Sequence, residues 1–219
     1  MTPPFELTGP SAGPLHEGRP RHLVILLHGY GANGDDLIGL APVLAPVLPD
    51  TLFVAPNAPY PCDMNPAGFQ WFGISNLNPD IMLAGTRSVG PTLDAYLTTE
   101  MARHGLDESK TALVGFSQGT MMALHVGLRR ARPFAGIIGY SGALPGAAAL
   151  PEEIKSRPPV LLVHGDADPM VPVQALKLAQ QGLEAAQVPV EAHVSPGLGH
   201  GIDQLGIELG AAFLQKVLA

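Results

Sequence analysis

The chain has 219 residues, of which 46% are hydrophobic and 14% charged, so it is long and apolar enough to fold around a sizeable core. Its formal net charge of −7 argues against nucleic acids and anionic membranes as partners, because basic surfaces bind both. The single cysteine, Cys62, excludes an intrachain disulfide and a cysteine-based zinc site.

The first 22 residues contain scattered charges and prolines but no apolar segment of the kind found in signal peptides. The longest aliphatic run nearby, residues 23–27, is too short to span a bilayer. We therefore expect a cytoplasmic protein without stable membrane insertion.

Short apolar runs rich in β-branched residues alternate with longer segments of helical character. This alternation predicts an α/β fold in one domain, residues 1–219, with a mainly parallel sheet covered by helices on both faces. The predicted strands are residues 22–28, 51–55, 111–115, 136–140, 160–164 and 190–194, with a weakly marked strand at 5–8. The predicted helices are residues 35–48, 81–104, 119–132, 173–186 and 202–218.

Ser117 lies at the centre of Gly115-Phe116-Ser117-Gln118-Gly119, between a predicted strand and a predicted helix. A serine hydroxyl is a weak nucleophile, and a tight strand-to-helix turn exposes it to a general base. The crowded backbone of such a turn requires glycine on both sides. Ser117 is therefore the candidate nucleophile; the alternative is a glycine-rich turn without a catalytic role.

His200 is the candidate general base among eight histidines. It lies in the loop between the last predicted strand and the last predicted helix, where α/β-hydrolases carry their catalytic histidine. Packing or solvent exposure explains the positions of most of the other histidines.

Two carboxylates follow the strand predicted at 160–164, and one of them is expected to orient the histidine. Asp168 is preferred over Asp166 because it lies deeper in the loop, where Pro169 stiffens the turn. A third interpretation makes His164, Asp166 and Asp168 a metal site, but no matching ligand set occurs elsewhere, so no metal is expected. The chain order Ser117, Asp168, His200 is that of α/β-hydrolases and predicts this fold.

Two backbone N–H groups are expected to bind the oxyanion that forms during acyl transfer. One belongs to Gln118, directly after the nucleophile. The other comes from the loop after the strand predicted at 22–28, where Tyr30 is preferred over Gly29.

Residues 57–79 form a long segment rich in proline and aromatic residues, which is typical of a binding loop or lid. Trp71, the only tryptophan, is either part of the substrate-binding surface or a packing anchor. Phe72 and Met170 are the other residues expected to contact substrate.

The chain resembles the acyl-protein thioesterase and bacterial carboxylesterase/phospholipase family of α/β-hydrolases. The motifs that carry this resemblance are residues 26–31, 71–74, 115–119, 140–145, 164–172 and 199–200. The resemblance implies the triad Ser117, Asp168 and His200, oxyanion donors at Tyr30 and Gln118, no large cap domain, no cofactor, and a monomer or homodimer. Tyr30, where the family commonly has leucine, and the unusual segment 65–70 leave the substrate size open.

The expected function is hydrolysis of small-molecule esters with short-to-medium acyl groups through an acyl-enzyme. Because the sequence contains no evident hydrophobic lid helix, a lipase acting at lipid–water interfaces is less favoured. Acyl-protein thioesterase and lysophospholipase activities are the alternatives within the same chemistry. A binding protein that keeps the fold without catalysis is the alternative outside it.

Overall fold

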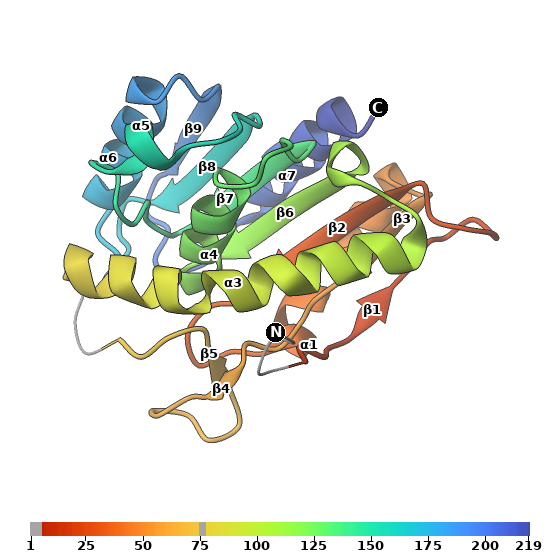
Figure 1. Cartoon of the computed structure of the whole chain (residues 1–219), viewed down its shortest axis with the longest axis horizontal. Helices are drawn as coiled ribbons and strands as arrows, with labels where there is room; N and C mark the ends of the chain where they lie inside the picture. The colour runs from red at the N-terminus through yellow and green to blue at the C-terminus, as the bar shows by residue number, and fades with distance from the viewer. Residues whose placement is uncertain (1–5, 75–77) are drawn as a thin grey trace.

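The sheet at the centre of the computed structural model, which describes residues 6–74 and 78–219, has seven strands in the order β1-β3-β2-β6-β7-β8-β9. Neighbouring strands are parallel throughout, except for the antiparallel pair β1 and β3. Helices cover both faces of the sheet, and the long helix α3 crosses its front (Figure 1). The predicted mainly parallel α/β architecture is confirmed.

The strands of this sheet are β1 (Ser11–Ala12), β2 (His22–Leu27), β3 (Thr51–Val54), β6 (Thr111–Phe116), β7 (Gly136–Tyr140), β8 (Val160–Gly165) and β9 (Val190–Ser195). The six main predicted strands agree with β2, β3 and β6 to β9 to within one residue. The strand predicted at 5–8 is wrong for residues 6–8, and residue 5 lies outside the described part. Pairing with β3 begins at Ser11 because Pro10 has no N–H to donate to a ladder.

The helices are α1 (Gly34–Ile38), α2 (Ala41–Leu44), η1 (Ala45–Val47), α3 (Pro79–His104), η2 (Glu108–Lys110), α4 (Gln118–Gly127), α5 (Leu150–Glu153), α6 (Gln174–Ala185) and α7 (Gln204–Val217). The single helix predicted at 35–48 is instead three short helices, because Pro42 and Pro46 cannot donate helical hydrogen bonds. Two short strands, β4 (Tyr60–Pro61) and β5 (Phe69–Gln70), form a hairpin within the segment 57–79.

Helix α4 ends at Gly127, five residues before the predicted end. The carbonyl of Leu128 accepts a hydrogen bond from the Lys155 amide at 2.9 Å, and the carbonyl of Gly127 accepts one from Ser156 Oγ at 3.2 Å. The segment after α5 therefore satisfies carbonyls that a continuing helix would have used. This distant contact is not visible in the local sequence.

Strand β2 contributes to a core on each side of the sheet, as its uninterrupted apolar sequence requires. Leu23, Ile25 and Leu27 pack with residues of α3, α4 and α6, whereas Val24 and Leu26 pack with residues of α1, α2 and α7. This sandwich fixes the positions of the strand ends that carry the candidate site. In the part of the chain that the structure describes, no helix combines the length and apolarity needed to cross a membrane.

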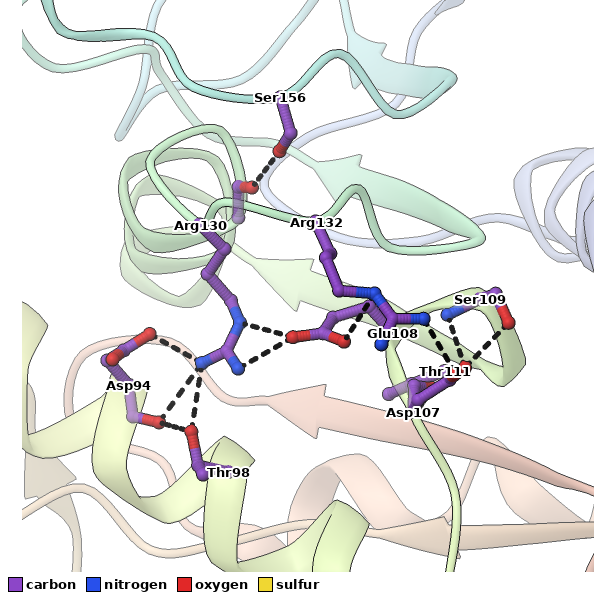
Figure 2. Close-up of polar contacts among 10 residues, drawn as sticks. Asp94, Thr98, Asp107, Glu108, Ser109, Thr111, Arg130, Arg132 and Ser156 are labelled. Atoms are coloured by element: carbon purple, nitrogen blue, oxygen red, sulfur yellow. Dashed lines mark hydrogen bonds and ion pairs between the residues drawn. The ribbon is translucent and has the colours of Figure 1, made fainter.

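Arg130, just beyond α4, is the centre of an ion-pair network (Figure 2). Its guanidinium group lies 2.8 Å from Glu108 Oε1, 2.6 Å from Asp94 Oδ1 and 3.1 Å from Thr98 Oγ1. The network lines a groove of about 880 Å³ that also includes Arg87, away from the predicted catalytic residues. Because these arginines are paired with carboxylates of the same groove, we assign it no ligand.

We expect Arg130→Ala to lower the free energy of unfolding by about 2–3 kcal/mol at pH 7, since it leaves the poorly solvated Glu108 carboxylate with only the longer ion pair to Arg132, at 3.6 Å. The side chains of both residues are only 12% exposed. Burial by itself would raise the pKa of Glu108, but the Arg130 hydrogen bond and neighbouring charges outweigh it and hold the pKa below the ordinary 4.5.

A carboxylate with a depressed pKa in the folded state stabilises above its unfolded pKa, and this contribution is lost as the pH falls through the folded value. The difference between wild type and Arg130→Ala should therefore shrink below pH 4.5, as measured by urea unfolding at pH 7 and pH 3.5. Lys216→Ala, which breaks an exposed pair with Glu191, is the control and should cost less than about 1 kcal/mol. Equal losses in the two variants would contradict the prediction.

Candidate active site

The residues predicted for catalysis follow the carboxyl ends of β2, β6, β8 and β9. These strands are parallel members of one sheet, so their carboxyl ends lie along the same edge. The edge brings Ser117, Asp168 and His200 into one region although they are far apart in the sequence.

Ser117 occupies the turn between β6 and α4 with φ 54° and ψ −115°, a backbone conformation that is costly for a residue with a side chain. Its hydroxyl makes no capping hydrogen bond to α4, so it is not occupied by the helix. A Cβ on Gly119 would collide with the Leu27 carbonyl oxygen, and one on Gly115 would collide with the Thr120 amide. The two glycines of the motif therefore permit the close packing that this turn requires.

His200 and Asp168 form a short hydrogen bond between Nδ1 and Oδ2, at 2.7 Å. The Asp168 side chain is fully buried, whereas that of His200 is 20% exposed. The other carboxylate oxygen accepts the amides of Met170 and Val171 at 2.8 and 2.9 Å. Burial by itself would raise the pKa of Asp168, but these hydrogen bonds outweigh it and lower the pKa, which keeps the group an anion facing the imidazole.

Asp166, the competing carboxylate, has a different partner. Its Oδ1 accepts the Gly197 amide at 2.6 Å and so links the loop after β8 to the loop that carries His200. Ser141 Oγ, after β7, donates to the Gly201 carbonyl of the same loop at 3.1 Å. In the residues that the structure describes, no group of three or more His, Cys, Asp or Glu side chains is arranged to hold a metal ion.

The imidazole of His200 packs against the ring of Phe116, with the two ring centroids 4.9 Å apart. Phe116 directly precedes the candidate nucleophile in the sequence. Within the described part of the chain, Ser117 Oγ has no hydrogen bond to His200 or to any other residue. Such catalytic hydrogen bonds are often long without substrate and shorten in the reacting complex. The site therefore contains a formed Asp–His pair and, within the described residues, a serine hydroxyl that makes no hydrogen bond.

The loop after β2 lies against the turn that carries Ser117, since a Cβ on Gly29 would be 3.1 Å from the Ser117 Cβ. In this loop the amides of Gly31 and Ala32 already donate to the carbonyls of Phe69 and Gly29, at 2.9 and 3.2 Å. These hydrogen bonds do not use the amides of Gly29 and Tyr30, the two predicted candidates for the second oxyanion donor. Gln118 is the first residue of α4, where backbone N–H groups have no acceptor within the helix.

The three residues expected to contact substrate have different environments. Trp71 is completely buried and Phe72 is only 5% exposed, whereas the side chain of Met170 is 63% exposed. This burial favours Trp71 as a packing anchor over Trp71 as part of the substrate-binding surface. The ring of Phe72 fills the space beside Gly85 of α3. Only Met170 of the three presents a large apolar surface next to the Asp168 loop.

His164 lies near the site, although sequence reasoning gave it no part in the catalytic triad and considered it only in a possible metal site. Its Nε2 donates to the Val171 carbonyl at 2.8 Å and lies 3.3 Å from Asp168 Oδ2. Asp168 Oδ2 is thus flanked by two imidazoles, His164 and His200. The spacing of four residues between His164 and Asp168, just after a strand, was the one signal that could have indicated this contact.

Comparisons with known proteins identify the family of the chain. The family model described as Phospholipase/Carboxylesterase matches residues 15–218. Esterase YpfH of Escherichia coli (strain K12) is 29% identical over 198 residues, which make up 90% of this chain and 84% of the relative. The crystal structure of esterase PE8 is 44% identical and superimposes with a TM-score of 0.94, covering 98% of this chain and 100% of that one.

Acyl-protein thioesterase 2 of Zea mays superimposes with a TM-score of 0.78 at 24% identity, over 97% of this chain and 99% of that one, and so supports the fold alone. The sheet, the family match and the esterase relatives lead to the same assignment. The chain belongs to the phospholipase/carboxylesterase family and is a carboxylesterase-type hydrolase with the α/β-hydrolase fold.

Proposed function

We propose that the protein hydrolyses carboxylic esters with short-to-medium acyl groups, with Ser117 as nucleophile, His200 as general base and Asp168 as the acid that orients it. The observation that carries this proposal is the 2.7 Å bond between His200 Nδ1 and the buried Asp168 carboxylate. This bond places the histidine proton on Nδ1 and leaves Nε2 free to accept a proton.

In the proposed mechanism, His200 Nε2 removes the proton from Ser117 Oγ as the oxygen attacks the ester carbonyl carbon. The N–H groups of Gln118 and Tyr30 stabilise the negative oxygen of the tetrahedral intermediate. His200 then protonates the leaving alcohol oxygen as its bond to the acyl carbon breaks. A water molecule, deprotonated by the same histidine, then attacks the acyl carbon. The bond from this carbon to Ser117 Oγ breaks, His200 returns the proton to Oγ, and the carboxylic acid is released.

The preference for short-to-medium acyl groups is part of the proposal. It rests on how much apolar surface the loops around the site expose. Two of the relatives are named as esterases, which supports esters as the substrate class. Met170 is exposed beside the Asp168 loop, whereas Trp71 and Phe72 are buried and offer little surface to a long acyl chain. A short or medium acyl group fits this limited apolar surface better than a fatty-acyl chain.

Hydrolysis of p-nitrophenyl esters from acetyl to palmitoyl, beside an acyl-thioester series of the same chain lengths, tests the proposal. We expect the largest kcat/KM for p-nitrophenyl esters of up to about eight acyl carbons, and no turnover above background in Ser117→Ala. A maximum at palmitoyl, or a preference for thioesters, would replace the short-ester assignment by a lysophospholipase or thioesterase role. Absence of turnover with every substrate would favour a binding protein.

A further inference from the structure

We propose that the side chains of Gln118, Trp71 and His28 are positioning groups that hold the backbone donors of the oxyanion hole in place. The inference rests on the proposed function and concerns the same site. Gln118 is fully buried. Its Oε1 accepts the Trp71 amide at 2.8 Å, and its Nε2 donates to the Phe72 carbonyl at 2.7 Å. The residue that supplies one oxyanion donor through its backbone is thus tied to the segment 71–72 through its side chain.

Trp71 extends this connection to the loop that supplies the other donor. Its indole Nε1 donates to the His28 carbonyl at 3.0 Å. That carbonyl belongs to the same peptide unit as the Gly29 N–H. Because a peptide unit is planar, a hydrogen bond that fixes its carbonyl also fixes the direction of its N–H.

The next peptide unit is held in the same way by the imidazole of His28. Its Nε2 accepts the Ala58 amide at 2.9 Å, so the proton must lie on Nδ1, which donates to the Gly29 carbonyl at 2.8 Å. This carbonyl shares a peptide unit with the Tyr30 N–H. Burial lowers the pKa of His28, in keeping with the neutral form that this pattern of hydrogen bonds requires.

Trp71 therefore orients the Gly29 N–H directly, and it holds the backbone of His28, whose buried side chain orients the Tyr30 N–H. Oxyanion stabilisation depends on donors that are already oriented before charge develops, and removing one donor typically costs about 10²–10³ in rate. A small misalignment should cost less than full removal. The buried hydrogen bonds of Gln118 and Trp71 thus have a consequence for kcat beyond their contribution to folding.

The variant Trp71→Phe removes the indole N–H but keeps an aromatic ring in the core. We expect kcat for the best ester to fall about 10- to 100-fold while KM changes less than about threefold, because the lost interaction acts on the transition state. The affinity of a boronic acid that mimics the tetrahedral intermediate should fall in parallel with kcat/KM. A purely structural role would lower the melting temperature without this parallel loss.

Phe53→Leu is the matched control, since Phe53 is equally buried but belongs to the core on the other face of the sheet. It should lose stability and keep kcat within about twofold. Gln118→Met provides a second test that leaves the backbone N–H of residue 118 in place, and it should also lower kcat at least tenfold. If either Trp71→Phe or Gln118→Met folds and keeps kcat within twofold of wild type, the positioning role is wrong.

The experiments distinguish a failure of the proposed function from a failure of the positioning role. If wild type and Ser117→Ala are equally inactive on every ester and thioester, the proposed function fails, and the positioning role fails with it. If wild type hydrolyses esters and the folded positioning variants do so equally well, the function stands and only the inference is overturned.

Discussion

Ser117→Ala is expected to lower kcat for ester hydrolysis by at least about 10⁴-fold, because no other group at this position can form the acyl-enzyme. The free energy of unfolding should change by less than about 1 kcal/mol. Alanine meets the same backbone cost at φ 54° as serine, and the serine hydroxyl makes no capping bond that would be lost. Steady-state hydrolysis of a p-nitrophenyl ester, together with thermal unfolding, measures both quantities.

Mass spectrometry after reaction with a fluorophosphonate adds an independent check. Wild type should gain one label, on the peptide that contains Ser117, and Ser117→Ala should gain none. A label on another serine, or residual activity above about one part in a hundred, would show that the nucleophile lies elsewhere.

Asp168→Asn is expected to lower kcat about 10⁴-fold near neutral pH, an effect of the size seen when a triad aspartate is replaced by its amide. The Asn Oδ1 can still accept the amides of Met170 and Val171, so the loop should keep its shape. Its NH2 group would face His200 Nδ1 and force the imidazole proton onto Nε2. The histidine then cannot accept the Ser117 proton.

Asp166→Asn provides the comparison, because Asp166 lies in the same loop two residues earlier. Its carboxylate accepts the Gly197 amide, and an asparagine oxygen can accept the same hydrogen bond. Activity should therefore stay within about fivefold of wild type. Pre-steady-state hydrolysis at pH 7.5 compares the two variants, and a greater loss in Asp166→Asn than in Asp168→Asn would exchange their roles.

Much of the fold followed from local patterns in the chain. The six long strands were predicted to within one residue, and five of them are largely apolar runs of the kind that is stable when both faces of a sheet are covered. The exception is the edge strand β9, which contains Glu191 and His193 and is largely exposed or half-buried. The end of α4 was missed because it depends on Lys155 and Ser156, which are distant in sequence and donate hydrogen bonds to the carbonyls at the end of the helix. The break in residues 35–48 had a local signal in Pro42 and Pro46.

The sequence by itself determined the candidates for chemistry, since a strained turn needs glycines around Ser117 and the chain order of Ser117, Asp168 and His200 matches one fold. Only the tertiary structure decided which carboxylate meets His200, because that contact joins two loops 32 residues apart. It also decided that Trp71 is buried and bonded to His28 and Gln118. Backbone requirements leave a local mark on the sequence, whereas a hydrogen bond between distant side chains depends on how whole elements pack.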